Sequence, residues 1–464
     1  MVVPSRLAKL GVYGFDTVEP IILAALVTGD PLLLIGKSGS GKTYLLISLS
    51  EALGLTYRHY NASLISFDDL VGFPYPTPDY SSVRYLETPA TVWGAETVLI
   101  DEVSRCKPEH QNRLFSLIQE RRIQGILLDK LHYRWAAMNP CDLNQGADDF
   151  YAGSEPLDQA LADRFAFLVE VPDWNELGEE DQKAIADPRG DGLVSNDQGE
   201  LESCVLEWKR EFQELLAHPP EKAMDYARLV ATLLGQAGWR VSPRRVRQLV
   251  RNLLAVSVVS EDLTLEKQFL LTLRWSIPHR AWGKIPKEEV ILAVHRNAWK
   301  AVDKPGPEGW LNQFHLEPEL HKKAKLLFAH CPDKDTGSLG VTQLLAREPK
   351  ERALVFAFAT YPAALRGKLP IGKEGVNELG KLAAPLLDVQ GEIKWQERWS
   401  DTNTQHPEYS RLSQILGTLR ERRRERAAQL FYYLLVNHIA VRDPEGLEKE
   451  LDKCISVVRS FLEN

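Results

Sequence analysis

Cysteine is scarce in this chain and is not arranged for cross-linking. The 464 residues include five cysteines, none of them in a C-x-x-C pair, and the count is odd. This pattern argues against a disulfide framework and against a zinc site, and the scattered histidines suggest no metal site either. A reducing cytoplasm is therefore the expected compartment. The cysteines are Cys106, Cys141, Cys204, Cys331 and Cys454.

Long apolar runs and an excess of positive charge are also missing. No apolar run approaches the roughly 20 residues that span a bilayer. The best candidate, LFYYLLVNHIAV (430–441), contains a His and an Asn and predicts a buried helix. Lysine and arginine number 56 against 64 aspartates and glutamates, so the net charge of −8 does not favour a general nucleic-acid binder. The basic cluster RERRRER (420–426) fits a nucleic-acid or acidic partner, or more commonly a solvated helix face.

A glycine-rich stretch, LLLIGKSGSGKTYLLISL (32–49), fits the pattern G-x-x-x-x-G-K-[ST]. Glycines let successive backbone amides turn toward phosphate oxygens, and the following helix adds its positive end. Lys42 would reach the β and γ phosphates, and Thr43 would bind Mg²⁺. A chance glycine loop is the alternative, but an apolar strand before it and a helix after it favour a phosphate site. The predicted nucleotide-contacting residues are Gly36, Lys37, Ser38, Gly39, Ser40, Gly41, Lys42, Thr43 and Tyr44.

Polar residues follow two later predicted strands. ETVLIDEVSR (96–105) places Asp101 and Glu102 at a strand end, where one carboxylate can hold Mg²⁺ and the other can activate water. YRWAAMNP (133–140) ends in Asn139, which can orient that water. Alone, these patterns would indicate a solvated strand end and an Asn-Pro turn. Because strands alternate with helices along this part of the chain, we predict an α/β fold whose five parallel strands carry these groups at their carboxyl ends.

The motifs taken in order resemble those of AAA+ ATPases, specifically the MoxR group and its dynein-related relatives, which include the GvpN, CbbQ and NorQ types. The resemblance extends over roughly residues 10–285 and implies ATP and Mg²⁺ as ligands. It rests on GKSGSGKT (36–43), DDLVGF (68–73), ETPATVWGAETVLIDEVSRCKPEHQNRLFSLIQERRI (87–123), AAMNP (136–140), EPLDQALADRF (155–165), VSPRRVRQLVR (241–251) and LRWSIPHR (273–280).

The resemblance also assigns roles to individual residues. Lys42 and Thr43 correspond to the nucleotide and Mg²⁺ positions, Asp101 to the Mg²⁺ carboxylate, Glu102 to the catalytic base and Asn139 to sensor 1. Arg164 in LADRF corresponds to the arginine finger that enters a neighbouring subunit, and Arg244 to the sensor 2 arginine of the lid. Arg164 could instead be an ordinary surface charge, and Arg244 could belong to a basic helix face that it shares with Arg240, Arg245 and Arg247.

Residues 61–95 form a long connection rich in Pro, Asp, Tyr and Ser. Such length within a compact domain usually indicates a functional insertion. The resemblance implies a hairpin near the central pore of a ring, where Phe73, Tyr75 and Tyr80 could grip a client. The alternative is a surface loop whose aromatic side chains pack back on the domain.

We expect three regions: a nucleotide-binding α/β domain (1–175), a helical lid (176–285, with 176–205 as linker) and a mostly helical extension (286–464). The predicted function is an ATP-hydrolysing, ring-forming remodelling ATPase that acts like a chaperone on a protein client. The family resemblance implies a hexamer and a separate partner that carries a von Willebrand factor A domain. The extension is a candidate adaptor for client or partner. The alternatives are an NTPase of a nucleic-acid-directed defence or restriction system and a nucleotide-gated scaffold. The choice between ATP and GTP stays open.

Overall fold

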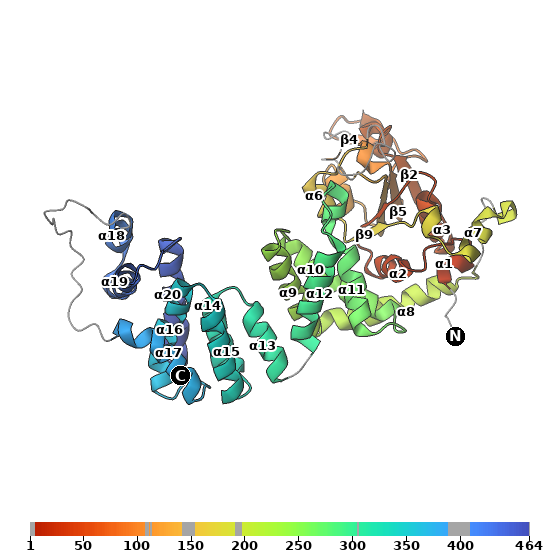
Figure 1. Ribbon diagram of the computed structural model, residues 1–464. Helices are drawn as coiled ribbons and strands as arrows, with labels where there is room; N and C mark the ends of the chain where they lie inside the picture. Colours follow the sequence, from red (N-terminus) through yellow and green to blue (C-terminus); the bar gives the residue numbers. More distant parts are fainter. Residues whose placement is uncertain are drawn as a thin grey trace. The chain divides into compact units, whose positions relative to one another are not determined.

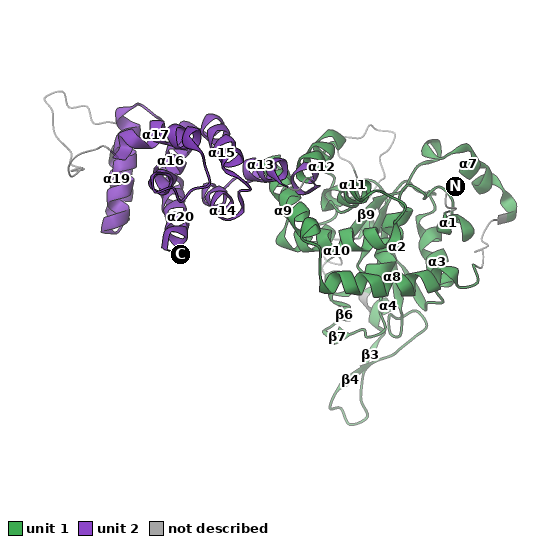
Figure 2. Cartoon of the chain, turned by 90° about the horizontal axis from the view of Figure 1, so that it is seen from below, with its two compact units in different colours: residues 1–298 green, residues 299–464 purple. Residues whose placement is uncertain are grey.

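The computed structural model describes residues 5–106, 111, 114–141, 154–190, 197–303, 306–387 and 409–463. The chain forms two compact units, residues 1–298 and 299–464, shown in different colours in Figure 2. The first unit contains both the predicted nucleotide-binding domain and the predicted lid. The boundary between the units falls within α12 (Glu288–Asp303).

A parallel sheet of five strands forms the centre of the first unit (Figure 1). Every neighbouring pair in this sheet is parallel, which confirms the predicted α/β architecture. The strands, in spatial order, are β2 (Tyr57–Asn61), β5 (Thr97–Asp101), β8 (Tyr133–Met138), β1 (Leu32–Ile35) and β9 (Phe167–Glu170).

Both faces of the sheet are covered, which explains why its strands read as continuous apolar runs. Side chains alternate across a strand, so Leu33 and Ile35 enter one core together with Ile100 and Met138. Leu34, on the opposite face of β1, is fully buried as well. A strand with apolar side chains on both faces belongs in the interior of a sheet. Its burial fixes the position of the loop that follows it.

Helices surround this sheet and build the lid. In the lid, α10 packs against α2, α8, α9 and α11 and is therefore its central helix. The predicted linker contains α7 and the start of α8. The longer helices are α2 (Glu19–Thr28), α3 (Lys42–Ala52), α7 (Glu179–Ala186), α8 (Glu200–Ala217), α9 (Glu221–Gln236), α10 (Pro243–Val259) and α11 (Leu265–Trp275).

Short elements complete the first unit. Two antiparallel hairpins, β3–β4 and β6–β7, stand apart from the main sheet. They consist of β3 (Pro74–Pro76), β4 (Val83–Tyr85), β6 (Arg122–Ile123) and β7 (Ile126–Leu127). The short helices and turns are α1 (Arg6–Lys9), α4 (Phe67–Val71), α6 (Gln159–Ala162), η1 (Val103–Arg105), η2 (Ser116–Glu120), η4 (Trp174–Glu176), η5 (Pro188–Gly190) and η6 (Pro278–Trp282).

The second unit is helical within its described residues and has a hydrophobic core of its own. Arg423 of the basic cluster forms a two-point ion pair with Glu448, at 2.8 Å for the shorter contact, which joins α19 to α20. The helices are α13 (Pro307–Leu316), α14 (Leu320–His330), α15 (Lys334–Arg347), α16 (Lys350–Leu365), α17 (Lys373–Leu387), α18 (Tyr409–Thr418), α19 (Glu421–Val436) and α20 (Pro444–Glu463).

The apolar stretch that begins at residue 430 lies at the end of α19. Leu430, Phe431 and Leu434 pack into the core of the second unit, as expected for a buried helix. Across the ranges that the structure describes, no helix combines the length and the apolar character needed to cross a membrane.

The lid is attached to the sheet domain through η6. The ring of His279 lies between Trp239 and Trp282, at centroid distances of 5.3 Å and 4.4 Å, and the residue is 4% exposed. Burial, reinforced by the charge of Arg245, lowers the pKa of His279 from 6.5 to about 4. The imidazole is therefore neutral in the folded protein at neutral pH.

This histidine should make the lid attachment sensitive to acid. Below pH 6.5 the unfolded chain protonates His279, whereas the folded chain resists protonation down to a pH of about 4. The free energy of unfolding should therefore fall by about 2 kcal/mol at this residue between pH 7 and pH 5. Urea denaturation at both pH values should show a smaller loss for His279→Gln, which cannot titrate. Equal losses in the variant and the unmodified protein would contradict the assignment.

Candidate nucleotide site

The glycine-rich loop leaves β1 and enters α3 directly. Gly39 and Gly41 have φ angles of +81° and +78°, in the left-handed region that side chains with a Cβ disfavour. Gly41 is the N-cap residue of α3, so the loop ends where unpaired amides of the helix begin. This is the geometry that binds phosphate in front of a helix N-terminus.

Lys42 points back into this loop. Its Nζ donates to the carbonyl oxygens of Gly36 at 2.8 Å and Lys37 at 2.7 Å. Burial lowers the pKa of Lys42, and the nearby charges of Asp101 and Glu102 oppose that shift. The Lys42 ammonium is thus held inside the loop by carbonyl oxygens, which the phosphate oxygens of a bound nucleotide can replace. The loop, the helix end and the ammonium together fit a triphosphate.

Thr43 and Asp101 meet across the site. The Thr43 hydroxyl donates to the Asp101 carboxylate at 2.7 Å, and the Glu102 amide donates to the other carboxylate oxygen at 2.8 Å. Burial alone would raise the pKa of Asp101, but hydrogen bonds from His59, Thr43 and the Glu102 amide together lower it. An ionised carboxylate beside a hydroxyl is a donor set that fits Mg²⁺, as predicted for these two residues.

Glu102 has a backbone φ of +53°, which is uncommon for a residue with a side chain. Its carboxylate accepts from Asn61 Nδ2 at 3.1 Å and lies 3.5 Å from Arg105. Sequence reasoning did not select Asn61. The sequence offers only one signal for Asn61, which is a polar residue at the end of β2. Its proximity to Glu102 depends on the pairing of β2 with β5, in which Asn61 lies opposite Asp101.

Asn139 follows β8 and is buried at 7% exposure. The adjacent strand is β1, whose following residue Gly36 donates its amide to the carbonyl of Met138 at 3.1 Å. The loop, the Asp101–Glu102 pair and Asn139 therefore follow three neighbouring strands at the same edge of the sheet. This arrangement was predicted from the order of the strands.

A cavity of about 1250 Å³ opens beside the loop. Its lining includes Tyr44 from the predicted set, and an ion pair at 3.1 Å between Lys37 and Asp173 joins the loop to the segment after β9. The cavity has the size of a site for a small ligand such as a nucleotide. Sequence reasoning missed its apolar wall, because these residues come from two distant segments. They include Val12, Tyr13, Phe15, Val171, Trp174 and Leu177.

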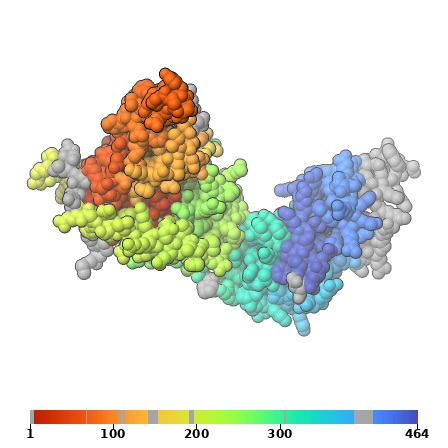
Figure 3. All heavy atoms as spheres, turned by 180° about the vertical axis from the view of Figure 1, so that it is seen from behind, coloured from red at the N-terminus to blue at the C-terminus, as the bar shows by residue number. Residues whose placement is uncertain are grey.

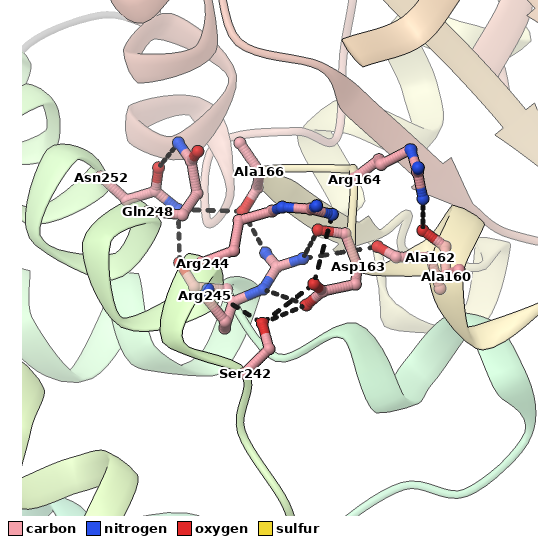
Figure 4. A network of polar contacts seen from close by, with 11 residues as sticks. Ala160, Ala162, Asp163, Arg164, Ala166, Ser242, Arg244, Arg245, Gln248 and Asn252 are labelled. Atoms are coloured by element: carbon pink, nitrogen blue, oxygen red, sulfur yellow. Dashed lines mark hydrogen bonds and ion pairs between the residues drawn. The ribbon is translucent and has the colours of Figure 1, made fainter. Parts of the chain in front are cut away.

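Arg164 and Arg244 do not line this cavity. The Arg164 guanidinium lies 4.3 Å from the centre of the Phe115 ring and donates to the carbonyl of Ala160 at 2.5 Å. Arg244 is 48% exposed and lies 3.7 Å from the Asp163 carboxylate. Burial and then the charge of Arg244 lower the pKa of Arg164, so the two guanidiniums influence each other. Figure 4 shows both arginines beside Asp163.

Two substitutions should separate binding from hydrolysis. Lys42→Ala removes the loop cation and should abolish binding of a fluorescent ATP analogue. Glu102→Gln keeps the fold but cannot take a proton, so hydrolysis should fall by about 10² to 10⁴ while binding persists. Lys381→Ala is the control, because Lys381 lies in the second unit and pairs at the surface with Glu378. Loss of binding in Lys381→Ala, or retention in Lys42→Ala, would refute these roles.

The phosphate loop, the paired carboxylates and Arg164 lie within a segment that matches a known family model. Residues 31–165 match the model of a family described as the AAA domain, dynein-related subfamily. A crystal structure of a candidate ATPase from Cytophaga hutchinsonii ATCC 33406 has 20% sequence identity and a TM-score of 0.48, covering 62% of this chain and 91% of that chain. No curated protein matches the chain significantly. Residues 31–165, which contain the phosphate loop and the paired carboxylates, therefore form an AAA domain of the dynein-related kind.

Proposed function

We propose that this ATPase assembles into a homo-oligomeric ring, a hexamer by its resemblance to other AAA+ proteins, and uses hydrolysis of Mg-ATP to remodel a protein client. The observation that carries the proposal is the position of Arg164. Charge that develops on the γ-phosphate needs a fixed cation. The guanidinium of Arg164 contacts the Phe115 ring and the Ala160 carbonyl rather than its own phosphate loop, and we infer that it acts on the site of a neighbouring copy.

Within one subunit, each residue of the nucleotide site has a separate proposed role. Lys42 binds the phosphates, and Thr43 and Asp101 would hold Mg²⁺, which neutralises phosphate charge when bound. Glu102 takes the proton of the attacking water, and Asn139 orients that water. The contacts of Glu102 with Asn61 and Arg105 hold its carboxylate in a defined position before the reaction. Because the second carboxylate is present, turnover is favoured over a static scaffold.

Between subunits, Arg164 would complete the site of a neighbour, and Arg244 beside it would add a second positive charge. An arginine supplied by a separate protein contributes about 10³ to 10⁵ in rate in the best-studied GTPases. Arg244 was predicted to act as sensor 2 of its own lid. Its contact with Asp163 brings it to the turn that carries Arg164, which favours a role at the same intersubunit surface.

The insertion supplies a surface for the client. Residues Pro74–Tyr85 contain the β3–β4 hairpin, which extends away from the body of the first unit in Figure 2 and forms its outermost tip, in orange, in Figure 3. Phe73 is 65% exposed, Tyr75 44% and Tyr80 83%. These aromatic side chains do not pack back on the domain, which favours gripping of an extended protein segment.

We propose that the helical second unit, which has a hydrophobic core of its own, serves as an adaptor. We assign to it a separate partner with a von Willebrand factor A domain, by family resemblance. None of the five cysteines, all within the described residues, forms a disulfide, which supports a reducing compartment, the cytoplasm. A nucleic-acid-directed NTPase is the second candidate. Its main support, the basic cluster, is weakened because Arg423 is engaged with Glu448.

The ring can be tested with the Glu102→Gln variant, which should bind ATP and stall. Its solution mass, measured by light scattering with and without Mg-ATP, should shift from a smaller species to about six subunits, in line with how symmetric homo-oligomers close. Lys42→Ala is the control, because it should stay small under both conditions. Stimulation of the unmodified enzyme by DNA or RNA would favour the second candidate.

A monomer that holds ATP would contradict the autonomous ring. Arg164→Ala refines the test, because its loss should leave ATP binding intact while hydrolysis falls by about 10³ or more. Full activity of Arg164→Ala would mean that hydrolysis does not require this arginine, and it would contradict the proposal.

A further inference from the structure

The turn that carries Arg164 is held by the lid helix α10. Asp163, which ends α6, accepts from the hydroxyl of Ser242 at 2.9 Å and from Nε of Arg245 at 3.4 Å. Arg244 adds an ion pair at 3.7 Å. Figure 4 shows this carboxylate in the centre of the network, while the Arg164 side chain points away from it toward Ala160. One side chain thus joins the start of the lid helix to the residue that precedes the arginine finger.

Arg245 holds the backbone on both sides of Arg164. Its NH2 group donates to the carbonyls of Asp163 at 2.9 Å and Ala162 at 3.4 Å, and its NH1 group donates to Ala166 at 3.2 Å. The side chain is 3% exposed, and burial lowers its pKa to about 10 although Asp163 opposes the shift. A buried guanidinium with all these partners fixes the path of the chain from 162 to 166.

Stability alone does not require this buried charge, because well-packed apolar residues often stabilise a fold as well as a buried ion pair does. The same helix also has other attachments to the sheet domain. Asn252 donates to the carbonyl of Ala166 at 2.9 Å, and Arg251 pairs with Asp30 at 3.0 Å. What distinguishes Arg245 and Asp163 is that their contacts surround Arg164.

The N-terminus of α10 belongs to the same unit. Ser242 caps the helix by accepting from the Arg245 amide at 3.1 Å while it donates to Asp163. The cap, the two arginines of the helix and the finger turn therefore share one carboxylate. If the lid rotates, the turn must move with it, because otherwise the contacts of Asp163 with Ser242 and Arg245 would break.

We propose that Asp163 and Arg245 are positioning residues that set the direction of Arg164 and couple it to the lid, so that the state of the lid in one subunit controls hydrolysis in the next. This inference rests on the proposed intersubunit role of Arg164. It assigns Arg245, which sequence reasoning grouped with a basic helix face, a function distinct from that of Arg244.

The test uses full-length Arg245→Met and Asp163→Asn variants. Each variant keeps its own phosphate loop and Glu102, so the KM for ATP should stay within about twofold. The kcat should fall by about 10²-fold, because a small misplacement of a catalytic group lowers the rate by about that factor. Mixing either variant with Glu102→Gln subunits should restore hydrolysis, since those inactive subunits supply a correctly held Arg164. A merely structural defect would not be complemented in this way.

Arg251→Met is the matched control, because it removes an arginine from the same helix and breaks an ion pair to the sheet domain without touching the finger turn. Its kcat should be unchanged within about twofold. If Arg245→Met does not fold, Asp163→Asn decides the question in the same assays. Near-normal kcat in Asp163→Asn, or no restoration on mixing, would overturn the inference.

Arg164→Ala separates this outcome from failure of the proposed function. If Arg164→Ala is inactive and is restored by Glu102→Gln subunits, the intersubunit finger holds whatever the positioning variants do. If Arg164→Ala is fully active or is not restored by mixing, the intersubunit role itself is wrong, and with it the basis for coupling to the lid.

Discussion

The hydrogen bond from Thr43 to Asp101 is the contact on which the nucleotide site depends. It joins the first turn of α3 to the end of β5 at 2.7 Å, and so brings the phosphate loop to the carboxylates. Neither element could be displaced alone, because β1 and β5 each pair with β8 in a sheet that is buried on both faces. The positions of the phosphate loop and of Asp101 are therefore set by the packing of the apolar strands β1 and β5.

A second polar centre lies at Asp163, and it has a different purpose. The proposed roles of Lys42, Thr43 and Glu102 concern a ligand within one subunit, whereas Asp163 and Arg245 contact each other and the turn that carries Arg164. Buried charge is costly unless it is fully paired. Here the paired charges of Asp163 and Arg245 attach the lid to the turn that carries Arg164, which is the basis of the proposed communication between subunits.

Much of the site could be predicted from the sequence, because its signals are local. Gly41, Lys42 and Thr43 stand in a fixed spacing, and Asp101 and Asn139 each end an apolar run. Asn61 and the wall of the cavity could not be predicted in this way. Asn61 reaches Glu102 only through the pairing of β2 with β5, and Val12 and Trp174 share a cavity although they are far apart in the chain.

By itself, the sequence determined the five parallel strands, the loop and the carboxylates, because apolar periodicity and glycine spacing act over a few residues. Only the tertiary structure decided which of the neighbouring arginines is buried. Arg244 and Arg245 are adjacent in one helical turn, yet the first is 48% exposed and the second 3%. The physical reason is that a helix presents successive residues to different directions, and only the packing of α10 on the finger turn selects the direction that is buried.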